Sequence, residues 1–157
     1  MERLQVFNIL NHEYLSQITL RLKENTCLNG LFERLKEKEI KIKFFTCHQQ
    51  RDACLGVTFC VEKSYLKPVQ EILFQLCPNE EDIQIHKDAG MVAIHGPHFA
   101  EIPGIIYMMH ACLSSEGITV AAISTTVSTS YFVIPAADVV RAMDTLKSVF
   151  EIPRGKV

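Results

Sequence analysis

The residues that decide the fold are IPGIIYMMHACLSSEGITV, at positions 102–120. Ile105 and Met109 are spaced so that they lie on one face of a helix. Pro103 suits the first turn of a helix, and Gly117 suits the position after the last turn. This stretch therefore predicts a helix followed by a strand.

The segments on either side extend this pattern. One strand is expected before the helix and a hairpin of two strands after it, because β-rich runs flank the polar stretch TTVST. A closing helix begins near Pro135 and places its apolar side chains on one face. The expected strands are GMVAIH (90–95), ITVAAIS (118–124) and SYFVI (130–134), and the closing helix carries Val139, Met143, Leu146 and Phe150.

The first half of the chain repeats this order. Placing Leu31 over Met109 and Leu35 over Leu113 aligns the two helix-strand segments at one constant offset, which indicates an internal duplication. The expected elements are the strand SQITLRL (16–22), the helix CLNGLFERLKEKE (27–39), the strands IKIKFFTC (40–47) and LGVTFCV (55–61), the helix SYLKPVQEILFQL (64–76) and the strand DIQIHK (82–87).

The second repeat lacks a final strand, and the N-terminal run RLQVFNIL (3–10) has the composition to supply it. The predicted fold class is α+β, with two ferredoxin-like βαββαβ domains side by side. The first domain spans 11–88, and the second spans 89–157 with the strand 3–10 exchanged into it. Bare sheet faces or edges favour association, so a homodimer is expected.

Composition excludes several classes of protein. The chain has 157 residues, 48% of them hydrophobic, and a net charge of −2, so a folded core is expected but no broad basic face for nucleic acid. No apolar run is long enough to cross a membrane and no signal peptide is evident, which predicts a cytoplasmic protein. The six cysteines form no CxxC pair and are interpreted as small core residues.

A family resemblance is carried by IHGPHFAEIPGIIYMMHACLSSEGITVAAISTT (94–126) and VIPAADVVRAMDTLKSVF (133–150). These segments resemble the second ACT domain of an aspartokinase regulatory region, over residues 90–150. Residues 16–87 are similar in layout, but Lys23-Glu24-Asn25-Thr26 replaces the family's Asp-x-Pro-Gly loop. The resemblance implies exchanged fourth strands and the binding of an end-product amino acid, such as lysine or threonine, at an interface between ACT domains.

The expected ligand site combines the loop before the central helix with the entry to the hairpin. Unpaired amides at the start of a helix favour a carboxylate. Glu101 occupies the family's acidic position and can pair with an amine, whereas Val127 replaces a family acidic residue after the hairpin entry. The candidate ligand-binding residues are His98, Phe99, Ala100, Glu101, Ile102, Pro103, Gly104, Ile105, Ser124, Thr125 and Thr126.

Other functions remain as alternatives. The loop can instead be purely structural, in a ligand-free ACT dimerisation module. His95 and His98 have the spacing of a metal pair but lack a third ligand, so neither a metal nor a cofactor is expected. His110 is expected to be a packed ring. No glycine-rich phosphate loop is present, so the chain is expected to be a non-catalytic regulatory part that works with a kinase domain or subunit.

Overall fold

The computed structural model describes residues 3–77, 79–97, 99 and 101–153, and the chain divides into two compact units. The first unit comprises Tyr14–Asp88. The second unit comprises Met1–Glu13 together with Ala89–Val157. Within the described ranges, no helix is both long enough and apolar enough to cross a membrane.

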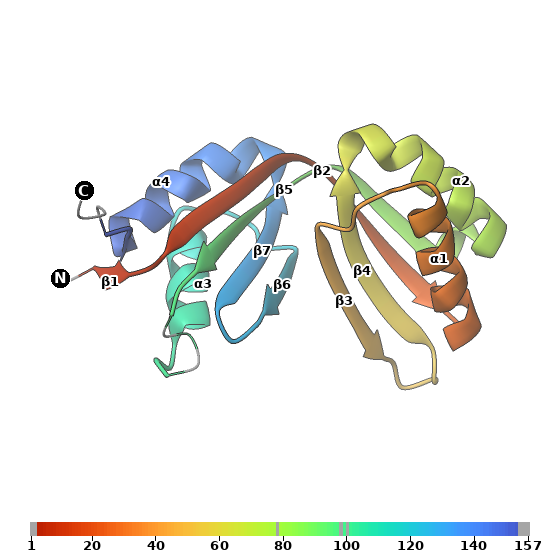
Figure 1. The fold of residues 1–157 in the computed structure, drawn as a ribbon, viewed down its shortest axis with the longest axis horizontal. Helices are drawn as coiled ribbons and strands as arrows, with labels where there is room; N and C mark the ends of the chain where they lie inside the picture. The colour runs from red at the N-terminus through yellow and green to blue at the C-terminus, as the bar shows by residue number, and fades with distance from the viewer. Residues whose placement is uncertain (1–2, 78, 98, 100, 154–157) are drawn as a thin grey trace. The chain divides into compact units, whose positions relative to one another are not determined.

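The first unit is a four-stranded antiparallel arrangement with two helices. Its strands lie in the order β3-β4-β2-β5 (Figure 1). β2 and β4 are in register with Ile18 opposite Phe59, and β3 places Phe45 opposite the same phenylalanine. The elements are β2 (Asn8–Leu22), α1 (Asn25–Glu37), β3 (Phe44–Gln49), β4 (Leu55–Glu62), the 3-10 turn η1 (Lys63–Tyr65), α2 (Leu66–Leu76), the turn η2 (Glu80–Asp82) and β5 (Ile83–His95).

Both helices of the first unit turn an apolar face toward one core. α1 contributes Leu31 and Leu35, and α2 contributes Val69, Ile72 and Leu73, all nearly inaccessible to solvent. They meet alternate side chains of the central strands, as expected where one face of a sheet is covered by helices. The strand residues in this core include Ile18, Leu20, Leu22, Val57, Phe59 and Val61.

The second unit has the same plan, with strand order β2-β5-β7-β6 and two helices. Val92 and Phe132 are directly opposite each other in β5 and β7, and both are fully buried. The core also holds Met109 and Leu113 of α3 and Leu146 of α4. The further elements are α3 (Ile105–Ser115), β6 (Ala122–Thr125), β7 (Thr129–Pro135), the turn η3 (Ala136–Asp138), α4 (Val139–Val149) and β8 (Phe150–Glu151).

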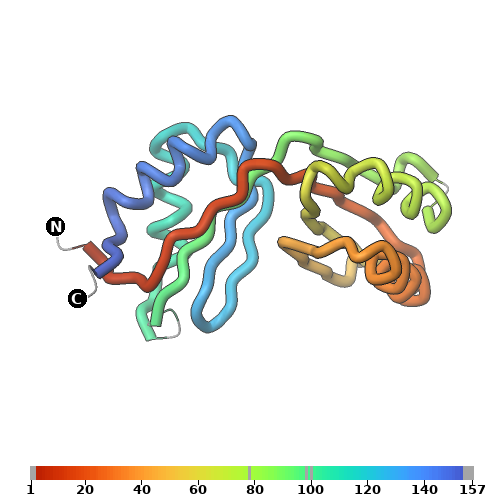
Figure 2. The backbone as a smooth tube through the Cα atoms, turned by 45° about the horizontal axis from the view of Figure 1, so that its top comes forward, coloured from red at the N-terminus to blue at the C-terminus, as the bar shows by residue number. Residues whose placement is uncertain are grey.

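The N-terminal segment lies in the second unit. β1 (Leu4–Gln5) pairs in parallel with β8, and the Val6 amide donates to the Glu151 carbonyl over 2.9 Å. The Phe7 amide donates to the His95 carbonyl over 2.8 Å. Figure 2 shows this segment running along the last part of β5. Val6 and Ile9 belong to the core of this unit.

Several boundaries differ from those expected. β2 and β5 are single long strands, and each of them has residues in both units. The central helix of the second unit begins at Ile105, two residues after Pro103. Likewise α4 begins at Val139, since a 3-10 turn follows Pro135.

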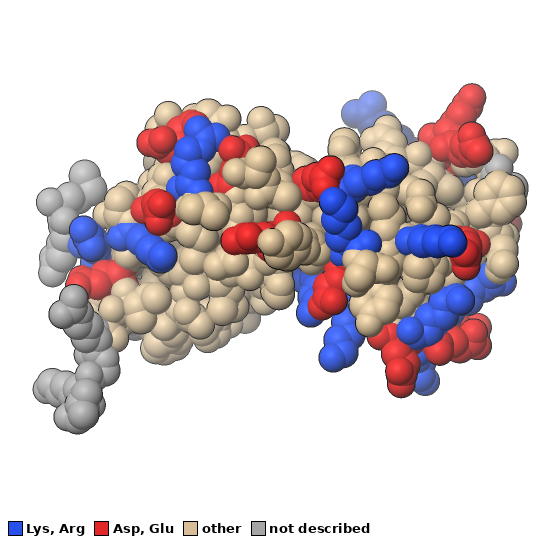
Figure 3. Space-filling model, turned by 90° about the horizontal axis from the view of Figure 1, so that it is seen from above, with Lys and Arg blue, Asp and Glu red and all other residues tan. Residues whose placement is uncertain are grey.

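Surface charge is mixed. On the face that Figure 3 shows, basic and acidic side chains are interspersed and no broad basic patch forms. The described ion pairs include Lys43–Glu62 at 3.2 Å and Arg141–Asp138 at 2.6 Å, and both are partly exposed. Such pairs add at most about 1 kcal/mol each to stability.

Candidate functional site

The predicted ligand loop lies wholly in the second unit, between β5 and α3. It starts at Gly96, whose amide donates to the Ser128 carbonyl over 2.8 Å. Phe99 is half-buried and packs against the core. A Cβ atom added at Gly96 would lie 3.5 Å from the Phe99 ring, so the ring and the Gly96 backbone are in close contact. The start of the loop is therefore held between the β6–β7 hairpin and the core. His98 and Ala100 lie outside the described residues.

The end of the loop, at Gly104, forms the N-cap of α3. Gly104 has a φ of 89°, a left-handed conformation that costs other residues energy, and its carbonyl accepts the Met108 amide over 2.9 Å. Ile105 is buried, whereas Glu101 and Pro103 are exposed. The first amides of this 11-residue helix lack partners within the helix and lie at its positive end. The expected helix start at Pro103 is thus wrong by two residues, and the amide cluster follows Gly104.

The predicted hydroxyl groups lie in and beside the β6–β7 hairpin. The Thr126 hydroxyl accepts the Thr129 amide over 3.1 Å and donates to the Thr129 carbonyl over 3.2 Å, so it stabilises the turn. The hydroxyls of Thr125 and Ser130 bond to each other at 2.9 Å. Ser124 lies on β6, which β7 separates from β5. The structure brings the hairpin turn next to the loop at Gly96. The hydroxyls of Thr125 and Thr126, however, make hydrogen bonds within the hairpin.

A residue that sequence reasoning did not place in this site is His95 at the end of β5. Its Nδ1 lies 2.8 Å from the Thr129 hydroxyl, and its ring centroid is 5.5 Å from that of Phe7. These contacts connect β5 to β7 and to Phe7, the residue just before β2, next to the start of the loop. Only the folded structure reveals them, because the three residues are far apart in the sequence. No group of three or more metal-binding side chains occurs among the described residues.

The first unit has a much shorter connection at the equivalent place. Only Lys23 and Glu24 separate β2 from α1, and the Thr26 hydroxyl donates to the Glu24 carboxylate over 3.0 Å. A loop that could surround a small molecule exists here only in the second unit, as far as the described residues go.

The cysteines whose pKa is raised by burial are poor nucleophiles. Burial raises the pKa of Cys60 to about 12 and also raises the pKa of Cys112. A thiol that stays protonated reacts slowly, because the thiolate is the attacking form. His110, which was expected to be packed, is instead exposed on α3, with its Nδ1 3.3 Å from the Ser114 hydroxyl. The equivalent Phe32 is also 37% exposed, so both positions lie at the outer side of their helices.

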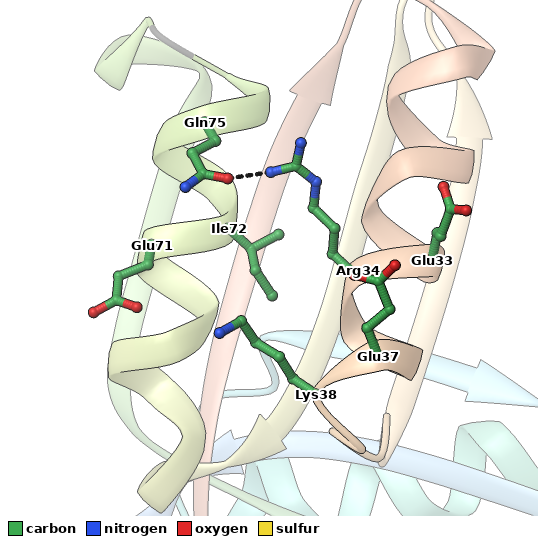
Figure 4. Close-up of a pocket in the computed structure, with 7 residues that line it drawn as sticks. All are labelled: Glu33, Arg34, Glu37, Lys38, Glu71, Ile72 and Gln75. Atoms are coloured by element: carbon green, nitrogen blue, oxygen red, sulfur yellow. Dashed lines mark hydrogen bonds between the residues drawn. The ribbon is translucent and has the colours of Figure 1, made fainter.

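Two grooves lie on the first unit, away from the predicted loop. One, of about 470 Å³, runs between α1 and α2 over Ile72 (Figure 4). Arg34 bonds across it to Gln75, and Lys38 extends into it. The other, of about 270 Å³, lies beside α2 and is more apolar, with Phe74 at its rim. Neither contains a residue of the predicted ligand set.

Comparison with known proteins agrees with this architecture. Residues 84–148 match the sequence profile of a family described as the ACT domain. This part of the chain is an ACT domain. The match covers α3, the β6–β7 hairpin and nearly all of β5 and α4. No curated protein sequence shows significant similarity to the chain.

Solved structures extend the similarity beyond the ACT profile. The ligand-free regulatory subunit of aspartate kinase from Thermus thermophilus has a TM-score of 0.80 and 20% identity, over 93% of this chain and 99% of that one. Aspartate kinase from Synechocystis has a TM-score of 0.83 and 19% identity, over 97% of this chain but 28% of that protein. Aspartokinase III from E. coli, in complex with lysine and aspartate, has a TM-score of 0.69 and 16% identity, over 95% of this chain and 34% of that one.

At these identities the likeness establishes the fold. The expected α+β class with an ACT-like fold is confirmed, and so is the resemblance to the regulatory regions of aspartate kinases.

Proposed function

We propose that this chain is a non-catalytic regulatory module of the aspartokinase type, built from tandem ACT domains, that binds a small amino acid. The ligand occupies the loop of the second unit, at an interface formed by ACT domains in a homodimer, and its binding is passed on to a kinase domain or subunit. The match along 99% of the Thermus thermophilus protein supports this proposal, because that protein is a regulatory subunit of aspartate kinase.

The exchange of the N-terminal strand belongs to the same proposal. Residues 3–10 supply the fourth strand of the second ACT domain. The bonds from Val6 to Glu151 and from Phe7 to His95 support it, since both lie within the second unit. A ligand that favours one arrangement of such linked domains can shift their equilibrium, typically by about 1–3 kcal/mol of coupling free energy.

The observation that carries the ligand proposal is the start of α3. Gly104 turns the chain so that the first amides of the helix follow an exposed loop. These amides suit the carboxylate of an amino acid, and Glu101, three residues earlier, suits its ammonium group. The resemblance adds lysine or threonine as candidates. Val127 is 73% exposed at the hairpin turn and offers no charge for a basic side chain, which favours a neutral amino acid.

A ligand-free dimerisation module is the second candidate. It is favoured by the hydroxyls of Thr125 and Thr126, which are already engaged within the hairpin. Tyr107 on α3 is 75% exposed, and apolar surface of this kind suits a contact with another protein.

Thermal unfolding with a panel of single amino acids separates the two candidates. At a hundredfold excess over its dissociation constant, a true ligand stabilises the folded protein by roughly 2.7 kcal/mol. A response to one or a few amino acids, with a dimer seen by light scattering, supports the regulatory module. A dimer whose unfolding no amino acid shifts supports the dimerisation module instead.

A further inference from the structure

The first unit brings together two cysteines from opposite ends of its sequence. Cys27 lies in the first turn of α1, and Cys77 directly follows the last residue of α2. The helices run in opposite directions: Gly30 lies beside Leu76, where an added methyl group would be 3.3 Å from the leucine side chain. The start of α1 is therefore packed against the end of α2, where the two cysteines lie.

Both thiols belong to one apolar cluster. Cys77 is 9% exposed within the core of the first unit, and Cys27 packs against that core while remaining half-exposed. Burial raises the pKa of the Cys77 thiol most, and the Cys27 and Asp82 groups raise that pKa further. The packing of the two helix ends places both thiols in this one cluster.

Small solutes can reach both thiols: Cys27 is half-exposed on the surface, and Cys77 borders a groove. Cys77 lines the groove of about 270 Å³ beside α2, together with Leu73, Phe74 and Ile83. The groove is mostly apolar, so it admits a small uncharged molecule more readily than a charged one. Hydrogen peroxide is such a molecule.

We propose that Cys27 and Cys77 form an oxidisable thiol pair, which hydrogen peroxide converts into a disulfide between α1 and α2. Cys27 reacts first, because it is the more exposed thiol and lies at the start of a helix. Its sulfur attacks one peroxide oxygen and the O–O bond breaks. A sulfenic acid forms, and the departing hydroxide takes up a proton to become water.

The second step closes the bridge. The Cys77 sulfur attacks the sulfenic sulfur, the S–O bond breaks, and the hydroxide that leaves takes the Cys77 proton to form a second water. Two thiols are oxidised while one peroxide is reduced to two waters. The bridge then ties together the two helices that cover one face of the first unit. This inference concerns the first unit alone and does not depend on the proposed function.

Peptide mapping of the intact chain tests the proposal. The reduced protein is treated with hydrogen peroxide, remaining thiols are alkylated, and trypsin digestion is followed by mass spectrometry without reduction. Cys27 falls in the peptide 24–34 and Cys77 in the peptide 64–87, and neither peptide contains another cysteine. We expect these two peptides joined, with the loss of two hydrogens, and released by reduction.

Variants separate the pair from general oxidation. Cys27→Ser should leave Cys77 alkylated after peroxide treatment, whereas Cys47→Ser, on the exposed part of β3, should still form the bridge. The proposal is overturned if wild-type Cys27 joins Cys47 instead, or if Cys27 is oxidised to sulfinic acid while Cys77 stays a free thiol. The wild-type experiment decides this even where a variant folds poorly.

Discussion

Glu39 and Gly117 occupy the same place after equivalent helices and share the same backbone conformation. Glu39 has a φ of 54° and Gly117 a φ of 70°. After each of them the next amide donates back to a leucine of the helix, from Ile40 to Leu35 over 2.9 Å and from Ile118 to Leu113 over 3.0 Å. Both helices thus end in the same Schellman motif. The second unit has a glycine, Gly117, at this position. The first unit has Glu39 there, in a left-handed conformation that glycine adopts more easily.

Glu39→Gly should stabilise the first unit. The change relieves the left-handed strain of a non-glycine residue, and the added freedom of the unfolded chain offsets part of this gain. The expected increase in the free energy of unfolding is about 0.5–1 kcal/mol, measured by hydrogen exchange of the α1 amides. Gly117→Ala is the matched reverse change and should weaken α3 by a similar amount. A loss of protection in Glu39→Gly would contradict the assignment of this motif.

Gly90→Ala should destabilise the second unit by about 1–3 kcal/mol. An added methyl group would lie 2.2 Å from the Val139 side chain and 3.0 Å from the His12 carbonyl oxygen. Gly56→Ala is a suitable control, because the nearest neighbours of its methyl group would be the ends of the His48 and Gln50 side chains, which can move. Urea unfolding followed by circular dichroism measures both changes.

A second substitution locates the clash of Gly90→Ala. Val139→Ala removes the nearest atom, so the double variant should lose less stability than the two single changes add up to. Additive losses would show that the close approach to Val139 is not the cause.

The α+β class and the buried faces of the helices could be predicted from the sequence, because apolar periodicity follows from local chemistry. Leu31 and Met109, aligned on that basis, are both buried helix residues. The exact start of α3 could not be predicted from the sequence. Pro103 and Gly104 each fit a helix start, and only the φ of Gly104 decides between them. The continuous strands β2 and β5 were also missed, because two shorter strands have the same alternation as one long strand.

Contacts between distant residues were beyond the sequence patterns. His95 meets Thr129 across the β5–β7 pairing and Phe7 just before β2, and Cys27 and Cys77 join one apolar cluster through the packing of two helices. Neither contact follows from spacing along the chain. The predicted ligand residues from Glu101 to Ile105 are contiguous and share one loop and helix start.

Alkaline pH should destabilise the first unit through Cys60. This thiol is fully buried, and its pKa rises from 9.0 to about 12 in the folded protein. Between these values the unfolded chain loses the proton while the folded chain keeps it, so stability is complete below about pH 9 and falls as pH rises. The expected slope is roughly 1 kcal/mol per pH unit from this residue.

Urea unfolding of Cys60→Ala over the same pH range isolates that contribution from tyrosines and lysines. The variant should start from lower stability, because it loses buried volume, but should lose less stability as pH rises. Equal slopes in both proteins would show that Cys60 does not stay protonated in the fold.

Glu101→Gln should weaken the response to an amino-acid ligand while leaving the dimer intact. The change removes the charge that is proposed to pair with the ammonium group, a contact that is typically lost at a cost of tenfold or more in affinity. An exposed loop carboxylate adds little to folding, so thermal unfolding without ligand should barely change. Glu116→Gln, an exposed position at the other end of α3, is the control and should respond like the wild type. If Glu101→Gln instead separates the dimer and the ligand response persists, Glu101 serves the association of copies and the ammonium group binds elsewhere.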